Sequence, residues 1–326
     1  MSADAARTVV ITGASAGLGY HAAEQLAAAG HRVVLATRDR GRAAAAERSI
    51  RRHVDGASLA HVHLDLADLD SVRAAAAELA QLEPDGVDAV VNNAGVVGAS
   101  TQRSTAQGTE LQIGTNHLGH FAWTGLVLPL LERRAGRIVH LGSIAHRFAQ
   151  LDPTDPLGVG RYSNHRQYAR SKLAVTLFGF ELAERLADSG SPVSSVVAHP
   201  GLSLDRLSPV RPDISPVRPE PEWIRPAARL VAQGKDVGAE PLVHAAVGAD
   251  VRSGEYWGPA GWGQLRGAST VVAAEPRAHD RTVAAQLWTA SARFRGRVRS
   301  RRIRLTLLPG RMSVLLRRLD DDDHHL

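Results

Sequence analysis

Residues 8–19 read TVVITGASAGLG and join an apolar run to a glycine-rich turn and an Ala/Leu-rich segment. The β-branched run Thr8–Thr12 predicts a buried strand, and Gly19–Ala29 has the pattern of a helix. Glycines allow a tight turn and close approach of the backbone to a ligand, while the first N–H groups of a helix favour an anion. The turn therefore suits a dinucleotide pyrophosphate, although its Gly-x-x-x-Gly-x-Gly spacing is not the common fingerprint and such turns also serve packing. Its glycines are Gly13, Gly17 and Gly19.

Apolar runs and helical patterns alternate along the first two-thirds of the chain. The runs are nearly all apolar, which is typical of parallel strands covered on both faces. The alternation predicts βαβ units and an α/β fold with a single Rossmann-type, doubly wound parallel sheet. The further predicted strands are Arg32–Ala36, Ala60–Leu64, Ala89–Asn92, Arg137–Leu141 and Val193–Ala198, and the helices include Leu69–Leu82, Leu118–Glu132 and Tyr168–Ser189.

Composition excludes several classes of protein. The 326 residues contain no cysteine, so disulfides, thiolate metal sites and cysteine nucleophiles are excluded. No secretory signal pattern and no run of about 18 apolar residues is seen, so we expect a cytoplasmic protein. The net charge of +6 comes from ten arginines within residues 293–318, and residues 1–292 are neutral. The charge therefore gives no reason to expect nucleic-acid binding by the main domain.

The last third departs from the strand and helix rhythm. Residues 202–226 hold six prolines and follow the sixth predicted strand, at the edge where open α/β sheets bind ligands. They predict a substrate-covering segment, or alternatively a plain surface loop. Helical pattern resumes at 227–233 and 240–247, and the Gly- and aromatic-rich residues 254–267 are expected to pack beside the cleft. We expect one domain over 1–296, with a substrate segment at 202–267, followed by a basic tail at 297–326.

The end of the second predicted strand bears on cofactor choice. An acid about 20 residues after the glycines grips the ribose of NAD, whereas an arginine accepts the 2′-phosphate of NADP. Thr37 and Arg38 occupy this position and favour NADP(H) over NAD(H). Asp39 complicates this reading, unless it caps the next helix. Arg38 could also be an ordinary surface charge.

Four polar residues carry the predicted chemistry. Tyr168 and Lys172 lie four residues apart, so they share one helical face. A nearby ammonium would lower the pKa of the phenol towards working pH. Ser143, after the fifth predicted strand, could polarise a carbonyl, and Asn116 adds a buried polar group. Alternatively, Ser143 caps a helix and Asn116 satisfies backbone groups.

These elements together resemble the short-chain dehydrogenase/reductase family over residues 7–296. The 25-residue gap from Ser143 to Tyr168 resembles members that are retinol dehydrogenase-like or protochlorophyllide reductase-like. The resemblance implies a sheet of about seven strands, the last near Val271–Ala274. The motifs that carry it are TGASAGLG (12–19), Asp65-Leu66, NNAG (92–95), Asn116, Ser143, YARSK (168–172) and Pro200-Gly201.

The resemblance also implies roles for individual residues. Tyr168 would be the general acid/base, Lys172 would lower its pKa and hold the nicotinamide ribose, and Ser143 would orient the substrate oxygen. Asn116 would anchor a water that links Lys172 to solvent. The remaining residues would bind the cofactor: Gly13, Ser15, Gly17, Leu18 and Gly19 at the pyrophosphate, Asp65 and Leu66 at adenine, Asn92 and Gly95 at the ribose, and Pro200 and Gly201 at nicotinamide.

One position departs from the family pattern. Similar members carry a threonine five residues after the proline of Pro200-Gly201, where it contacts the cofactor. Here that position is Asp205. A carboxylate beside a pyrophosphate would be repelled. Either Ser203 replaces the threonine, or Asp205 turns outward.

The tail and the histidines have plainer interpretations. Arginines and apolar residues in 293–318 could contact an anionic membrane surface weakly, but a solvated tail or a contact within an oligomer is favoured. The pairs His61/His63 and His117/His120 have metal-ligand spacings without a carboxylate cluster, so we expect structural histidines and no metal site.

We therefore expect an NADP(H)-dependent oxidoreductase that interconverts a carbonyl and an alcohol. Tyr256, Trp257 and Trp262 suggest a bulky lipophilic small-molecule substrate. The alternative is a catalytically silent NADP(H)-binding sensor or scaffold, which would not need Ser143 and Lys172. An epimerase-like enzyme fits less well, because its glycine spacing differs and its C-terminal lobe is larger.

Overall fold

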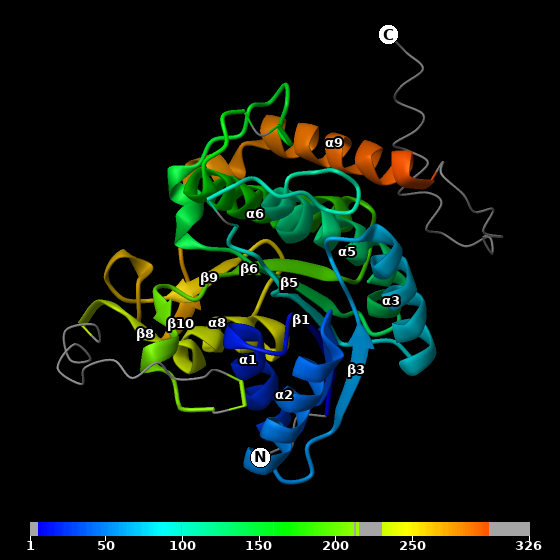
Figure 1. Ribbon diagram of the computed structural model, residues 1–326, viewed down its shortest axis with the longest axis vertical. Helices are drawn as coiled ribbons and strands as arrows, with labels where there is room; N and C mark the ends of the chain where they lie inside the picture. The colour runs from blue at the N-terminus through cyan, green and yellow to red at the C-terminus, as the bar shows by residue number, and fades with distance from the viewer. Residues whose placement is uncertain (1–5, 99, 159, 212, 215–229, 300–326) are drawn as a thin grey trace.

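A central eight-stranded sheet organises the molecule (Figure 1). The computed structural model describes residues 6–299 except 99, 159, 212 and 215–229. The strand order is β10-β9-β6-β5-β4-β1-β2-β3, and every pair is parallel except β9 with β10. The predicted Rossmann-type sheet is confirmed, with eight strands where about seven were expected. Its first six strands are β1 (Thr8–Thr12), β2 (Arg32–Thr37), β3 (Leu59–His63), β4 (Ala89–Asn92), β5 (Arg137–Leu141) and β6 (Ser194–Ala198).

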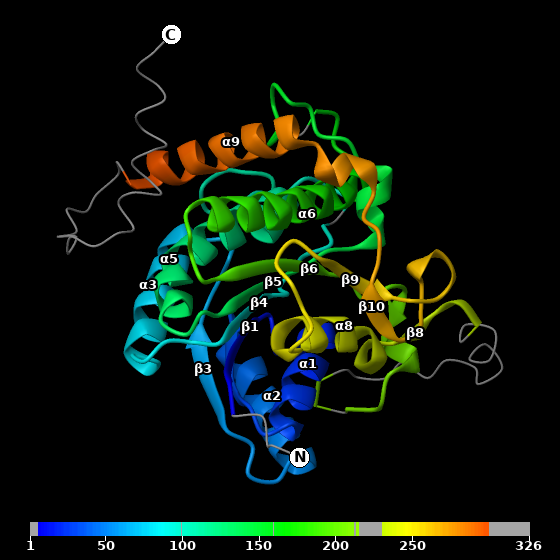
Figure 2. The same ribbon diagram turned by 180° about the vertical axis from the view of Figure 1, so that it is seen from behind.

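Helices cover both faces of the sheet, as the apolar strands require (Figures 1 and 2). Each face has its own apolar cluster, and the central strands contribute to both. α9 packs outside α6, so that side carries two helical layers. One face carries α1 (Gly17–Ala28), α2 (Arg40–His53) and α8 (Lys235–Val247); the other carries α3 (Leu69–Leu82), α5 (His120–Glu132), α6 (Asn164–Asp188) and α9 (Arg281–Arg299).

The strand order places a crossover between β1 and β4. The chain runs outward from β1 to β2 and β3, then returns to β4 on the other side of β1. Such a reversal leaves a crevice at the carboxyl ends of the strands, where ligands bind in open α/β sheets. The residues after β1, β4, β5 and β6 therefore meet at one edge.

Short elements surround this edge. A π-helix (Gly114–Gly119) joins α4 (Leu111–Ile113) to α5, and a 3₁₀ turn (Ile144–Phe148) follows β5. The segment after β6 forms β7 (Ser203–Leu204), which pairs with β8 (Gln233–Gly234). Further 3₁₀ turns cover Asp205–Leu207, Trp262–Gln264 and Pro276–His279. No helix among the described residues is long and apolar enough to cross a membrane.

The C-terminal edge of the sheet differs from the prediction. The last strand is β10 (Ser269–Val271), which begins and ends before the expected Val271–Ala274. Before it lies β9 (Tyr256–Pro259), which was predicted only as a Gly- and aromatic-rich segment. Its glycine and proline resemble loop composition, yet Gly258 lets the strand pass close to His199, where a Cβ would lie 2.1 Å from Nε2.

Helix boundaries also differ in places. α6 begins four residues before Tyr168, so the tyrosine lies in its second turn rather than at its start. Only residues 230–231 of the helix expected at 227–233 are helical, and Gln233 belongs to β8, while 227–229 lie outside the described residues. The predicted tail lies outside them beyond Arg299, and up to that residue it continues α9.

Candidate active site

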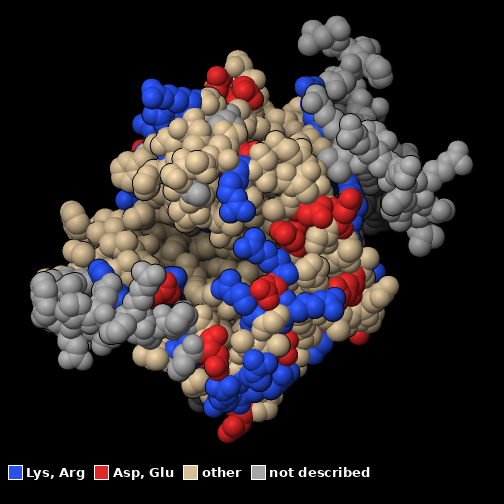
Figure 3. All heavy atoms as spheres, viewed as in Figure 1, with Lys and Arg blue, Asp and Glu red and all other residues tan. Residues whose placement is uncertain are grey.

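A cavity of about 580 Å³ opens at the carboxyl edge of the sheet, beside the crossover. Figure 3 shows a hollow on this face of the molecule, below α6 and near β9, with Lys and Arg side chains on its rim. Six of the predicted site residues do not contribute to the cavity lining: Gly17, Asn92, Asn116, Ser143, Pro200 and Gly201. Ten others line it: Gly13, Ser15, Leu18, Gly19, Arg38, Asp65, Leu66, Gly95, Tyr168 and Lys172.

The glycine turn is built for close approach. Gly13 has φ +68°, in the left-handed region that favours glycine. A Cβ on Gly19 would lie 2.6 Å from the carbonyl oxygen of Gly13 and 2.3 Å from Asn93 Nδ2. Ala16, at the N-cap of α1, makes no side-chain hydrogen bond to the helix. The first N–H groups of α1 therefore remain available, and the turn fits the pyrophosphate of a dinucleotide.

The end of β2 forms one end of the cavity. Arg38 lines the cavity together with Arg42, from the first turn of α2. Asp39 accepts a hydrogen bond from the backbone N–H of Arg42 at 2.9 Å and so caps α2. The capping alternative for Asp39 is thereby confirmed. One oxygen of its carboxylate is engaged with the helix, and Asp39 lines this part of the cavity together with the two guanidinium groups.

The residues after β3 and β4 divide into those that face the cavity and those that do not. Asp65 accepts from the backbone N–H of Ala67 at 2.9 Å, which fixes the turn beside Leu66. Asn92 is buried and donates to Thr124 Oγ1 at 2.9 Å, so it does not border the cavity as expected. Its neighbour Asn93 lines the cavity instead and donates to the carbonyl of Thr12 at 2.7 Å.

Tyr168 and Ser143 bring their hydroxyl groups together. Burial raises the pKa of the Tyr168 phenol, and its hydrogen bond with Ser143 lowers the pKa by a smaller amount. The net direction is upward, so the expectation of a lowered pKa is not met in this structure. Ser143 also accepts from the N–H of Ala145 at 3.2 Å and caps the following 3₁₀ turn. The capping interpretation of Ser143 is therefore confirmed, and its contact with Tyr168 leaves its role as a site residue a prediction.

Lys172 lies behind Tyr168 on α6. Its ammonium donates to the carbonyl oxygen of Leu141, at the end of β5, at 2.8 Å. It lies 5.9 Å from the centroid of the Tyr168 ring. Burial lowers the pKa of Lys172 to about 8. The lysine is therefore held between the end of β5 and the Tyr168 side chain, where both residues line the cavity.

Asn116 lies in the π-helix and holds the strand-end loop in place. It donates to the carbonyl of Val96 at 3.1 Å, accepts from the N–H of Val96 at 2.8 Å, and donates to Ser171 at 2.9 Å. A Cβ on Gly95 would lie 3.5 Å from Asn116 Oδ1 and 3.7 Å from Lys172 Nζ, so both residues border the same glycine. The side chain therefore satisfies backbone groups, as the plainer interpretation proposed, while remaining next to Lys172.

The loop after β6 crosses the open side of the cavity. Gly201 has φ +63°, and Pro200 accepts hydrogen bonds from Ser203 and from Gln233. These residues shape the loop without lining the cavity. Ser203 does line it, whereas Asp205 pairs with Lys235 Nζ at 2.6 Å. The carboxylate of Asp205 is thus compensated by a cation that the sequence did not indicate.

The aromatic residues near the C-terminus divide between core and surface. Tyr256 and Trp257 are buried in β9, at 3% and 4% exposure, so they are part of the core rather than of a substrate surface. Trp262 is 86% exposed and lines a separate cavity of about 310 Å³ with Leu230 and Val231. Only Trp262 of the three aromatics is therefore placed to meet a lipophilic ligand.

The histidines serve the fold around the site. His120 Nδ1 donates to the carbonyl of Asn116 at 2.9 Å, so Nε2 accepts from Thr12 Oγ1 at 2.9 Å. Burial lowers the pKa of His120 to about 4 and that of His117 to about 3, so both are neutral. The described residues contain no group of three or more His, Cys, Asp and Glu side chains that could hold a metal ion.

Among the cavity-lining residues outside the predicted site set, four bear on cofactor binding. Arg42 could have been found, because it lies four residues after Arg38 and a helix was expected there. Asn93 lies within the NNAG motif, next to the asparagine chosen in its place. Ser203 was weighed only as a substitute for threonine. The fourth, Lys235, comes from α8, and no local motif marks it.

Comparison with known proteins agrees with this arrangement. The model of the short chain dehydrogenase family matches residues 7–207. Human retinol dehydrogenase 13 is 36% identical over 295 residues, which span 89% of this chain and 85% of the human protein. The chain belongs to the short-chain dehydrogenase/reductase family. The predicted family and its retinol dehydrogenase-like resemblance are confirmed.

Further relatives support the same assignment. Mouse polyprenol dehydrogenase is 41% identical over 202 residues, covering 60% of this chain and 59% of that protein. An uncharacterised protein from Mycobacterium paratuberculosis has a crystal structure with TM-score 0.71, 36% identity and coverage of 88% of this chain and 92% of that one. A complex of Pseudomonas aeruginosa RhlG with NADP, at 24% identity and TM-score 0.59, shares the fold over 77% of this chain and 94% of that one.

As a short-chain dehydrogenase/reductase, the chain is an oxidoreductase that acts on carbonyl and alcohol groups. The family uses a nicotinamide dinucleotide. The glycine turn, the crevice at the crossover and the hydroxyl pair at its inner end match that use. The dinucleotide would extend from Arg38 across the turn towards Tyr168 and Lys172.

Proposed function

We propose that the protein interconverts a carbonyl and an alcohol with NADP(H) as the hydride carrier and Tyr168 as the general acid/base. The observation that carries this proposal is that one cavity extends from the glycine turn and Arg38 to the face where Tyr168 contacts Ser143. A silent sensor or scaffold would have no use for this half-buried hydroxyl pair next to a buried lysine. The enzymatic interpretation is therefore the better supported.

The residues at the Tyr168 end of the cavity can each perform one step of the reaction. When bound, the nicotinamide ring supplies or accepts the hydride. In the reductive direction Tyr168 donates its phenolic proton to the substrate oxygen, and Ser143 hydrogen-bonds the same oxygen to orient the carbonyl. Lys172 is held by the carbonyl of Leu141 and presents a positive charge that stabilises the phenolate left on Tyr168.

Selection of NADP(H) is proposed to occur at the opposite end. Arg38 and Arg42 line the cavity there, and Asp39, the residue that could have gripped a ribose hydroxyl, caps α2 instead. Guanidinium groups bind phosphate through paired, charge-assisted hydrogen bonds. Two such groups beside one another favour the dinucleotide that carries a 2′-phosphate.

The proposed substrate is a small lipophilic aldehyde, ketone or alcohol. Relatives include proteins named retinol dehydrogenase and polyprenol dehydrogenase. On this chain Trp262, Leu230 and Val231 present exposed apolar surface around the second cavity. Such a surface binds hydrophobic molecules better than charged ones.

The test is Tyr168→Phe, which removes the phenolic proton and keeps the ring. We expect turnover of any active aldehyde or ketone to fall by about 10³-fold or more, because the general acid is lost. NADPH affinity, followed by nicotinamide fluorescence, should change by less than about threefold. Phe180→Leu, also on α6, provides a control for packing effects. Normal turnover by Tyr168→Phe would refute the assigned mechanism.

A further inference from the structure

The pair formed by Lys235 and Asp205 lies directly over the glycine turn. A Cβ on Gly17 would lie 3.3 Å from Lys235 Nζ and 3.7 Å from its Cδ, so the lysine side chain passes across the first residue of α1. Lys235 lines the same cavity as Gly13 and Ser15. Its ammonium is therefore within reach of any anion held by the turn.

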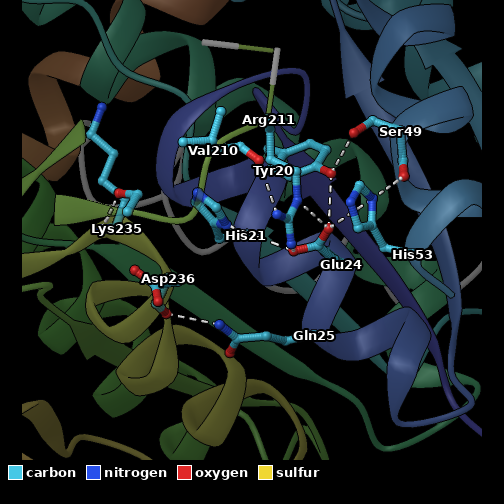
Figure 4. Close-up of polar contacts among 11 residues, drawn as sticks. Tyr20, His21, Glu24, Gln25, Ser49, His53, Val210, Arg211, Lys235 and Asp236 are labelled. Carbon is cyan, nitrogen blue, oxygen red and sulfur yellow. Dashed lines mark hydrogen bonds and ion pairs between the residues drawn. The ribbon is translucent and has the colours of Figure 1, made fainter. Parts of the chain in front are cut away.

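The neighbouring contacts fix the lysine in this place. Lys235 is the first residue of α8, and its backbone N–H donates to Ser208 at 2.7 Å. Gln25 in the second half of α1 donates to the carbonyl of Asp236 at 2.7 Å, which ties α1 to the start of α8. Figure 4 shows this contact beside α1, with the Lys235 side chain extending away from it.

A second cluster holds the loop that carries Asp205. Arg211 donates two hydrogen bonds to the carboxylate of Glu24 on α1, at 2.9 and 3.0 Å. Tyr20 donates to the same carboxylate at 2.9 Å (Figure 4). The segment between Ser203 and Arg211 is thus anchored at one end by β7 and at the other by α1. Asp205 is thereby kept beside Lys235.

The choice of lysine at this position is informative. The chain contains 37 arginines and only two lysines, Lys172 and Lys235, and both line this cavity. A cation at the first residue of a helix is opposed by the helix dipole, so its position calls for an anion nearby. Asp205 supplies one such anion, but its side chain is 58% exposed and an exposed ion pair contributes little to stability. Pairing with Asp205 alone does not account for a lysine that reaches the glycine turn.

We propose that Lys235 binds the pyrophosphate of the dinucleotide cofactor and that its pairing with Asp205 offsets the repulsion between that carboxylate and the pyrophosphate. The inference rests on the proposed use of a dinucleotide. The ammonium contributes the positive charge, and Asp205 pairs with it while its own carboxylate stays largely solvated. The pyrophosphate would then be held between the start of α1 and the start of α8.

The test compares Lys235→Met with Asp205→Asn in titrations of NADPH, NADH and ADP-ribose, the last of which carries a pyrophosphate but no nicotinamide. We expect Lys235→Met to weaken all three ligands by a similar factor of about tenfold or more, because the pyrophosphate is common to them. Asp205→Asn should bind them as well as the wild type or more tightly. Lys235→Arg should recover most of the affinity, and the double variant should bind more tightly than Lys235→Met.

The outcomes separate the two proposals. Unchanged affinities in Lys235→Met would overturn the inference alone. Equal losses in Lys235→Met and Asp205→Asn would also overturn it, because they would indicate a purely structural pair. A wild-type protein that binds none of the three ligands would overturn the proposed function as well. Lys235→Arg keeps the test valid if the methionine variant folds poorly.

Discussion

The buried carboxylate of Glu24 should make a measurable, pH-dependent contribution to stability. Burial raises the pKa of Glu24, but the neighbouring His21 and the hydrogen bonds from Arg211 and Tyr20 outweigh burial and lower the pKa to about 2 from an ordinary 4.5. Its side chain is only 13% exposed, so solvent screens these contacts weakly. A difference of this size corresponds to about 3 kcal/mol at 1.36 kcal/mol per unit.

The direction of the pH dependence follows from the linkage between protonation and folding. A carboxyl whose folded pKa is depressed stabilises the fold above its unfolded pKa and loses that contribution as the pH falls towards the folded value. Glu24→Gln should therefore lower the free energy of unfolding by about 3 kcal/mol at pH 7. At pH 3 the difference from the wild type should shrink to roughly 1.5 kcal/mol.

Urea unfolding followed by circular dichroism at pH 7, 5 and 3 measures both quantities. Glu47→Gln is a matched control, because Glu47 pairs with Arg51 on the exposed side of α2 and should contribute only about 0.3–0.5 kcal/mol. A destabilisation by Glu24→Gln that stays the same from pH 7 to pH 3 would refute the electrostatic reasoning. It would indicate that packing around Tyr20 is the dominant effect.

Two further predictions concern the end of β2. Arg38→Ser should raise the Kd for NADPH by about tenfold while leaving the Kd for NADH nearly unchanged, because only NADPH carries the 2′-phosphate. Parallel fluorescence titrations measure both Kd values, and equal losses of affinity for the two cofactors would contradict the prediction. Asp39→Ala should lower the free energy of unfolding by about 1 kcal/mol through loss of the α2 cap; a urea titration measures it, and no change would show that the cap in the structure contributes nothing.

Much of the fold could be predicted because its signals are local. The apolar runs of β1, β2, β4, β5 and β6 are buried on both faces, and a continuous apolar pattern bounded by helical segments predicts such strands well. β9 could not be predicted in this way, since Tyr256–Pro259 contains both a glycine and a proline. Its strand conformation depends on pairing with β6, which is remote in sequence.

The residues of the candidate site were likewise predicted where the signal is local and missed where it is not. Tyr168, Lys172 and Gly13 follow from spacing and from their place in the strand and helix order. The choice of Asn92 over Asn93 was wrong for the cavity, because alternate residues at a strand end point to opposite sides and the sequence does not give the side. Lys235 was missed because the glycine turn that it contacts is more than 200 residues away along the chain.

The π-helix at Gly114–Gly119 has a consequence for changes in chain length. Such a turn carries one residue more than the regular helical repeat. Removing that residue would let α4 and α5 merge into one α-helix. The residues before the deletion would then rotate about the helix axis by about 100° relative to those after it. Asn116 would then leave Val96, and Thr12 would lose its contact with His120. A deletion within this π-helix is therefore more damaging than most substitutions, because it moves Asn116 and His120 away from Val96 and Thr12 at the same time.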